Sequence, residues 1–266
     1  MSDKKILFIN TETEPYVPTT EMSKQGRLVP ETFQSKGHQI RTFMPKWGII
    51  NERRGQLHEV IRLSGLNIII DGTDHPLIIK VASIPVSRVQ VYFIDNDDYF
   101  TRRGMESDEE GTIYSDNVER AVFYARGVLE TVKKLRWIPD VIHCQGWMAS
   151  LIPLYIKHAY HDEPCFHEVK IVTSLSNVSC EGISGKNAKN SIAFRDITPE
   201  TLASYPENFC MKDLEKLAID FSDAVVEASA EINEELRVHA KEVVKTYLDY
   251  PGEDFAEAYK ALYDSL

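Results

Sequence analysis

DVIHCQGWMASLIPLYIK, residues 140–157, is the stretch of sequence that decides the fold. Its apolar run Val141–Cys144 is too short for a helix and is preceded by a Pro-Asp pair, a pattern typical of a buried strand. Gln145–Trp147 reads as a turn, and apolar residues at helical spacing predict a helix over Met148–Tyr160. A strand joined to a helix by a tight turn is half of a βαβ unit. Ligands of open parallel sheets bind at such turns, so we expect function here.

The remaining chain alternates strand-like and helix-like segments. This alternation predicts an α/β, Rossmann-like, doubly wound fold with a mainly parallel sheet. Turn signals at Ser64-Gly65 and Asp71-Gly72 predict a small antiparallel or mixed portion. The expected strands are Lys5–Ile9, Gln39–Met44, Val60–Leu63, Asn67–Ile70, Leu77–Ser83, Val89–Ile94, Lys170–Leu175 and Ala224–Ala228. The other expected helices are Glu21–Lys36, Asp116–Leu135, Phe209–Phe221, Ala230–Val238 and Asp254–Leu266.

The composition of the chain argues against some binding partners and locations. The formal net charge of −11 argues against general binding to nucleic acid or to anionic membranes. Lys46 with Arg53 and Arg54 could still hold an anion, or residues 51–54 could form a charged knot against the sheet. We expect neither a signal peptide nor a membrane-spanning run, and hence a cytoplasmic protein. The four cysteines have no paired spacing and are expected to be reduced thiols.

Six segments in order carry a family resemblance. The segments are KKILFINTETEPY (4–16), SKGHQIRTFMPKWG (35–48), VQVYFIDNDDYF (89–100), DNVERAVFYARGVLE (116–130), PDVIHCQGWMASLIPLYIK (139–157) and FSDAVVEASAEINEEL (221–236). Together they resemble the N-terminal domain of bacterial glycogen and starch synthases, which are retaining glucosyltransferases that use ADP-glucose. The resemblance implies a GT-B half-domain over residues 1–266, in which residues 254–266 form a C-terminal packing helix. The family's second domain is expected to be missing.

The chain departs from the family where the family binds the donor. After the first strand the family has Lys-Thr-Gly-Gly-Leu, whose lysine and glycines approach the diphosphate of the nucleotide sugar. Residues 18–22 read Pro-Thr-Thr-Glu-Met instead, with Pro18 at the lysine position and Thr20 and Glu21 at the two glycines, so that the carboxylate of Glu21 would repel a diphosphate. The family's His-Asp-Trp-His is replaced by Gln145–Met148, with Met148 in place of the histidine that approaches the sugar. Of the family's Ile-His-Asn, only Asn177 remains.

The substrate-binding face implied by the resemblance consists of Thr19, Thr20, Asn96, Trp147 and Asn177. Two parts of this face also have a structural interpretation: Trp147 is favoured as a core or lid aromatic, and residues 95–99 could form a solvated loop with capping carboxylates as well as bind sugar hydroxyls. His143 is favoured as a hydrogen-bonded core residue.

We expect no catalytic residue, metal or cofactor in this chain. The absence of a G-x-G-x-x-G motif argues against a dinucleotide cofactor. The spacing of the histidines and the cysteine between residues 158 and 167 matches no standard zinc site.

Two functions stay open. The first is that of the family, transfer of glucose from ADP-glucose to the end of an α-1,4-glucan, for which the isolated chain would be weak or inactive without a second domain. A homodimer or a complementing glycosyltransferase chain would then complete the cleft. The second is a non-catalytic protein that binds α-glucan or pairs with a glycogen enzyme. Whether the chain is an enzyme is therefore left undecided by its sequence.

Overall fold

The computed structural model describes residues 3–177, 182 and 184–266. Within them, ten strands form one sheet in the order β10-β9-β8-β7-β1-β2-β6-β5-β3, and β4 pairs with β5 beside this path. Neighbours from β10 to β6 run parallel, whereas β5 is antiparallel to β3, β4 and β6. The strands are β1 Lys5–Asn10, β2 Gln39–Pro45, β3 His58–Glu59, β4 Leu66–Ile70, β5 Thr73–Ser83, β6 Gln90–Asp95, β7 Val141–Gln145, β8 Lys170–Leu175, β9 Ala224–Glu227 and β10 Thr246–Leu248.

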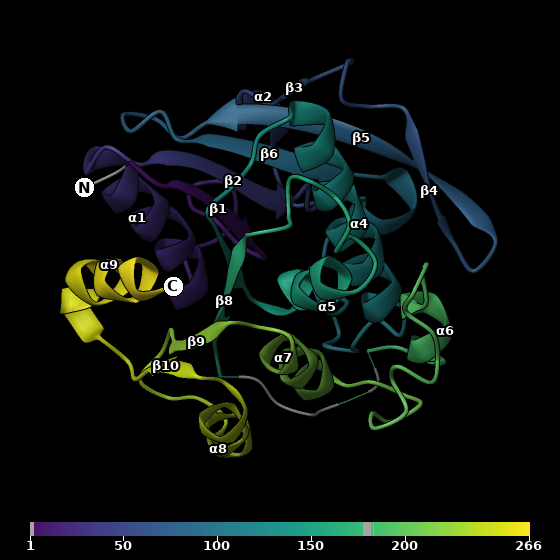
Figure 1. Cartoon of the computed structure of the whole chain (residues 1–266). Helices are drawn as coiled ribbons and strands as arrows, with labels where there is room; N and C mark the ends of the chain where they lie inside the picture. The colour runs from purple at the N-terminus through teal and green to yellow at the C-terminus, as the bar shows by residue number, and fades with distance from the viewer. Residues whose placement is uncertain (1–2, 178–181, 183) are drawn as a thin grey trace.

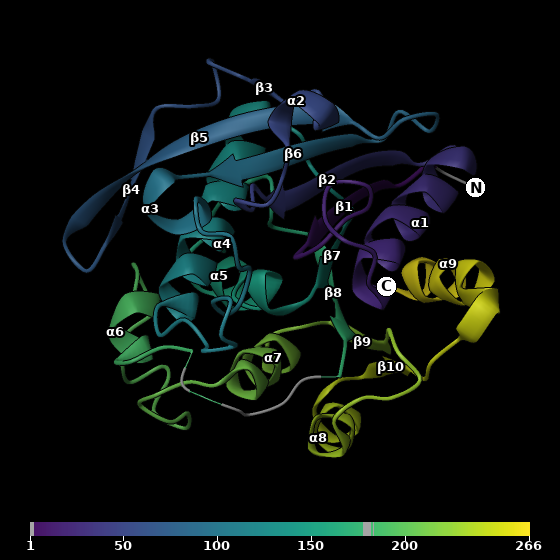
Figure 2. The ribbon, with the colours of Figure 1, turned by 180° about the vertical axis from the view of Figure 1, so that it is seen from behind.

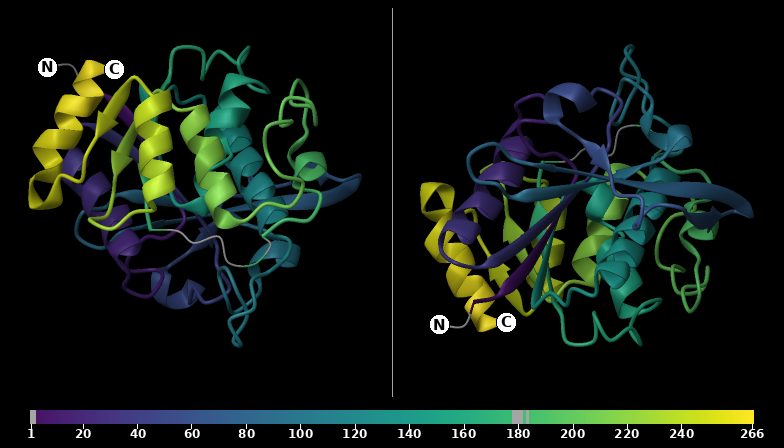
Figure 3. Two further views of the ribbon diagram at one scale, coloured as in Figure 1. Left: turned by 90° about the horizontal axis from the view of Figure 1, so that it is seen from below. Right: turned by 90° about the horizontal axis from the view of Figure 1, so that it is seen from above.

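Helices cover both faces of this sheet (Figures 1 and 2). The helices α1 and α9 lie side by side on one face, and α4, α5 and α7 lie on the other, as the views along the sheet also show (Figure 3). The α-helices are α1 Glu21–Ser35, α2 Glu52–Gly55, α3 Asp97–Phe100, α4 Asn117–Leu135, α5 Ile152–Lys157, α6 Ala188–Ile192, α7 Met211–Asp220, α8 Glu234–Val243 and α9 Phe255–Ser265, with 3-10 turns η1 Trp147–Ala149 and η2 Gly252–Asp254.

The alternation of side chains along β1 explains the two layers. Leu7 and Ile9 belong to the larger core, between the sheet and the helices α4, α5 and α7. Ile6 and Phe8 belong to the smaller core beneath α1 and α9. Because side chains alternate along a strand, one apolar strand contributes to both cores at once. The predicted fold class, a mainly parallel doubly wound sheet with an antiparallel portion, is thus confirmed.

Two predicted elements were wrong in detail. Val60–Leu63 is a turn closed by the hydrogen bond from the Leu63 N–H to the Val60 carbonyl, 2.8 Å, and only His58–Glu59 pairs as β3. The helix expected over Met148–Tyr160 begins as the 3-10 turn η1 and becomes α-helical only at α5. Pro153 stands in the first turn of α5, where its missing N–H costs no hydrogen bond.

The C-terminal part of the chain differs from expectation in three places. Helix α8 starts later than predicted because the Asn233 side chain caps it, accepting from the Glu235 N–H at 3.1 Å. Strand β10 was not predicted. Cys144 and Cys165 are free, whereas Cys210 is disulfide-bonded, so the expectation of four reduced thiols is wrong for Cys210. Spacing along the sequence does not reveal this bond. Cys180 lies outside the described residues.

Helix α9 packs on the sheet through a stripe of buried side chains, Tyr259, Leu262 and Tyr263. The Tyr263 hydroxyl is 2.5 Å from Nδ1 of His143, and Nε2 of His143 is 2.5 Å from the Ser174 hydroxyl. Burial lowers the pKa of His143 to about 3, so this histidine is a neutral core residue that links α9 to β7 and β8.

Replacing one buried side chain of α9 tests how much this packing contributes to stability. Leu262→Ala should lower the free energy of unfolding by about 2–4 kcal/mol, because a buried leucine leaves a cavity. Thermal denaturation should show a fall in Tm of at least about 4 °C. Glu257→Ala, on the same helix but exposed, is the control and should change Tm by less than about 2 °C. Equal small shifts for both variants would mean that α9 does not stabilise the sheet.

Candidate functional site

The candidate site lies where β1 and β7 run side by side in parallel, with Asn10 opposite Gln145. From β1 the chain continues to β2 on one side, while β7 is followed by β8 on the other. Such a switch in strand order leaves a crevice at the carboxyl ends of the strands. The Thr11 N–H donates to the Gln145 carbonyl at 2.9 Å, so the two loops leave the sheet already attached to each other.

Gly146 allows this attachment. Its φ of 78° lies in the left-handed region, and a Cβ there would come within 2.5 Å of the Thr11 Oγ1. That same hydroxyl oxygen accepts the Met148 N–H at 3.1 Å and donates to the Gln145 carbonyl at 3.2 Å. A larger residue at position 146 would therefore separate the two loops that form the crevice.

Two cavities open at this crevice. They have volumes of about 270 Å³ and 190 Å³ and share four lining residues, so we describe them together as the switch-point pocket. The residues lining it are Glu12, Thr20, Glu21, Met22, Gln25, Glu106, Gln145, Trp147, Ser176, Asn177, Met211, Ala228 and Ser229.

The charge of the switch-point pocket is entirely negative. Glu12, Glu21 and Glu106 contribute carboxylates, and no lysine or arginine is among the described residues that line it. The pocket also contains hydroxyl and amide groups from Thr20, Ser176 and Asn177. Such a surface suits the hydroxyl groups of a neutral ligand better than it suits phosphate.

The start of helix α1 is partly occupied by its own polar side chains. The Ser23 N–H donates to the Thr20 hydroxyl at 2.9 Å, and the Thr20 N–H donates to the Ser23 hydroxyl at 2.8 Å. This capping box satisfies amides that would otherwise attract an anion. The Thr20 hydroxyl in turn donates to Glu12 at 2.5 Å, and Glu21 adds a carboxylate to the first turn.

The carboxyls of Glu12 and Glu106 interact electrostatically. Burial raises the pKa of Glu12, although the hydrogen bond from Thr20 opposes this shift. Burial also raises the pKa of Glu106, and the nearby charge of Glu12 raises it further. An added anion would increase this repulsion between like charges, whereas a neutral hydroxyl could donate to either carboxylate.

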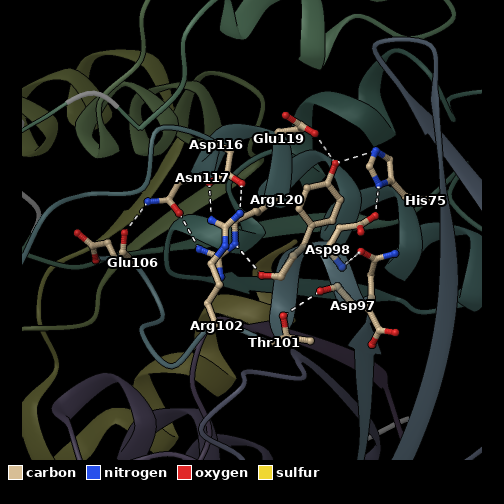
Figure 4. Close-up of polar contacts among 12 residues, drawn as sticks. His75, Asp97, Asp98, Thr101, Arg102, Glu106, Asp116, Asn117, Glu119 and Arg120 are labelled. Carbon is tan, nitrogen blue, oxygen red and sulfur yellow. Dashed lines mark hydrogen bonds and ion pairs between the residues drawn. The ribbon is translucent and has the colours of Figure 1, made fainter. Parts of the chain in front are cut away.

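The backbone around Glu106 is held by helix α4. Asn117 donates to the Glu106 carbonyl at 2.8 Å (Figure 4). The buried Arg120 donates to the Met105 carbonyl at 2.6 Å. Arg120 also donates to the Asn117 side chain at 2.7 Å, which joins these contacts into one network. Residues from an acidic loop thereby reach the pocket at a defined position.

An ion pair closes the same loop. Arg102 binds Asp116 through two hydrogen bonds of 2.7 and 2.6 Å, immediately before α4 (Figure 4).

The guanidinium of Arg120 lies 5.2 Å from the ring centre of Trp47 and 5.9 Å from that of Trp147. Burial lowers the pKa of Arg120 to about 10, yet it stays charged near neutral pH, and the aromatic faces partly compensate for lost water.

The structure brings together three of the five predicted site residues. Thr20 and Asn177 line the larger cavity, and Trp147 lines the smaller one with Asn177. Thr19 lines neither cavity and donates to Glu14 at 2.6 Å. Asn96 is buried away from the pocket, where its side chain donates to the Pro76 carbonyl at 2.9 Å and accepts from the Asp98 N–H.

The residue that replaces a family histidine at the pocket is Gln145, not Met148. Met148 is fully buried in the larger core, whereas Gln145, in place of the first histidine of the family motif, lines the pocket. Sequence analysis also missed Glu12, whose position two residues after a parallel strand could have revealed it. Nothing in the sequence singles out Glu106 from its acidic loop, because α4 places it.

A buried glutamate stands behind the pocket wall. Oε1 of Glu215 accepts from the Ser176 hydroxyl at 2.8 Å, and its Oε2 has no described hydrogen-bond partner. Burial raises the pKa of Glu215 to about 8, against which the bonds from Ser176 act only weakly. Glu215 is therefore mainly protonated at neutral pH.

Two other sequence hypotheses concern ions. Among the described residues, no group of three or more His, Cys, Asp or Glu side chains is placed to hold a metal. Lys46 contacts Glu52 at 3.2 Å, and Lys80 bridges Glu52 at 2.7 Å and the buried Asp95 at 2.8 Å. Lys46 thus belongs to a charged knot rather than to a free basic patch.

In the described part of the chain, no helix is long and apolar enough to cross a membrane.

The sequence of this chain is similar to those of known proteins. The family model "Starch synthase catalytic domain" matches residues 5–248. The chain belongs to the starch synthase family. Its relatives include a glycogen synthase of Chlorobium luteolum, 37% identical over 180 residues that make up 67% of this chain and 37% of that protein. A glycogen synthase of Chlorobium limicola is 35% identical over 75% of this chain and 40% of that protein.

The fold of the starch synthase family is also visible in solved structures. The catalytic domain of starch synthase IV from Arabidopsis thaliana, bound to ADP and acarbose, superimposes with a TM-score of 0.73 at 18% sequence identity. The match covers 95% of this chain and 52% of that one. The chain therefore has the fold of a GT-B half-domain and spans about two fifths of the length of the glycogen synthases it matches.

The proton on Glu215 should make stability depend on pH. An unfolded glutamate ionises near pH 4.3, whereas the folded one keeps its proton until about pH 8, so the free energy of unfolding should fall as pH rises between these values. Glu215→Gln keeps an acceptor for Ser176 and removes this dependence. Urea denaturation at pH 5, 6.5 and 8 should show the free energy of unfolding of the variant rising relative to that of wild type at each increase in pH. Parallel pH profiles would contradict the buried proton.

Proposed function

We propose that this chain acts in α-glucan metabolism by holding an α-glucan in the switch-point pocket, with little or no glucose transfer from ADP-glucose by the chain alone. The observation that carries the proposal is the filled start of α1. There the capping box of Thr20 and Ser23, with Glu12 and Glu21, stands where the family binds a diphosphate. Neutral hydroxyl groups of a glucan meet no such charge repulsion.

Three of the predicted substrate-binding residues support this role. Thr20 and Asn177 offer hydrogen-bonding groups to sugar hydroxyls, and Trp147 offers part of an aromatic surface at the pocket wall. The carboxylates of Glu12 and Glu106 add acceptors of the kind that sugar hydroxyls donate to. We propose Thr19 and Asn96 as residues that shape the neighbouring loops.

The family reaction remains the second candidate, because the pocket lies at the switch point where the family places its cleft. In that case a homodimer or a complementing glycosyltransferase chain supplies the cations that the described pocket lining lacks. We further propose that residues 1–266 are one N-terminal-type domain of this family, with residues 254–266 as its packing helix. The proposed location is the cytoplasm, where ADP-glucose and glycogen would be met.

Binding and transfer can be measured separately. In affinity electrophoresis through glycogen, wild type should be retarded, and Asn177→Ala should bind about fivefold more weakly, the effect of one lost hydrogen bond. Thr19→Ala, at an exposed residue outside the pocket, is the control and should match wild type. Coupled assays with ADP-glucose and glycogen should detect no ADP release above background. Steady release by the chain alone would refute the non-catalytic role, and absence of retardation would refute glucan binding.

Removing the negative charge should partly restore nucleotide binding. The triple variant Glu12→Gln, Glu21→Gln, Glu106→Gln should bind ADP at least tenfold more tightly than wild type by isothermal titration calorimetry, because like charges beside a diphosphate cost several kcal/mol. The control neutralises three exposed carboxyls elsewhere, Glu59→Gln, Asp74→Asn and Glu253→Gln. Equal gains in both variants would assign the effect to net charge rather than to the pocket.

A further inference from the structure

A separate cavity lies on the other side of the loop that follows β1. It has a volume of about 390 Å³, within the range of small-molecule sites. Its lining is mixed, with exposed polar surface from the α2 region as well as apolar side chains, and the residues lining it are Pro15, Tyr16, Ile49, Ile50, Asn51, Arg54, Gly55 and Pro85. None of these residues lines the switch-point pocket, so we name this cavity the Tyr16 pocket.

The Tyr16 pocket contains one cation without an anionic partner. Arg54 is exposed and forms no ion pair with any described residue. The carboxylate nearest to it in sequence, Glu52, is already bound by Lys46 and Lys80. Because the guanidinium of an arginine matches the geometry of phosphate and carboxylate groups, an unpaired arginine beside an apolar cavity favours an anionic ligand.

Part of the cavity wall offers apolar contact to a ligand. Ile49 is 39% exposed although it lines the cavity, so its side chain offers uncovered apolar surface. Next to the wall residue Pro85, Val86 is 98% exposed at a φ of 74°, a conformation that β-branched residues rarely adopt. Strained backbone of this kind is concentrated at ligand sites. Burial of the Ile49 surface by a ring would add hydrophobic stabilisation to the ion pair.

We propose that the Tyr16 pocket binds a small organic anion, whose phosphate or carboxylate group pairs with Arg54 and whose ring lies against Ile49 and Pro85. The Asn51 side chain, which accepts from the Arg54 N–H at 2.9 Å, orients the start of the segment that carries this arginine. This site is independent of glucan binding and of the family reaction. It gives a role to Arg54, one of the arginines associated with an anion from the sequence.

Phenyl phosphate is a probe that carries both required groups. In isothermal titration calorimetry, wild type should bind phenyl phosphate at least tenfold more tightly than it binds phenol, which lacks the charge, or inorganic phosphate, which lacks the ring. Arg54→Gln should weaken phenyl phosphate binding at least fivefold, the loss of one charge-assisted contact. Arg53→Gln removes the same charge from the neighbouring exposed residue, which does not line the cavity, and should stay within twofold of wild type.

Three outcomes would overturn the proposal. One is the absence of phenyl phosphate binding to wild type. Another is equal binding of phenyl phosphate and inorganic phosphate, which would mean that the cavity walls contribute nothing. The third is an equal loss in Arg53→Gln and Arg54→Gln, which would describe a diffuse positive surface. Thermal denaturation of both variants should match wild type, because neither arginine is buried.

Discussion

The parallel pairing of β1 with β7 is the constraint on which the rest of the site depends. Their register ends with Asn10 beside Gln145, and Thr11 then ties the two departing loops together across Gly146. The strand order runs outward from β1 to β2 on one side and from β7 to β8 on the other, so this pairing creates the crevice and fixes which loops surround it. The residues placed in those loops decide the chemistry, and here they are carboxylates and uncharged polar groups.

In this chain the scaffold of the starch synthase family carries carboxylates and uncharged polar groups at its pocket. A diphosphate needs free backbone amides and positive charge, and both are supplied by a few residues at the start of α1. In this chain Thr20 and Ser23 bind each other's amides, and Glu12 accepts from Thr20, so two amides at the helix start already have partners within the chain.

Sequence alone predicted the elements that depend on local pattern. The apolar run of β1 and the long periodic helix α4 were found nearly to the residue, since their burial repeats with a fixed period. The 3-10 start after β7 and the late start of α8 were missed because caps and Pro153 override the period. At the site, motif comparison led to Met148, whereas only the three-dimensional arrangement shows Gln145 and Glu106 at the pocket.

The protonated state of Glu215 has a consequence for the energetics of the whole chain. Near neutral pH the unfolded chain must release a proton from this side chain when it is exposed to water. The buffer takes up that proton, so the heat of unfolding measured in a calorimeter will differ between buffers by their heats of ionisation. The folded protein also carries one negative charge fewer than its formal count, which lowers its electrophoretic mobility slightly.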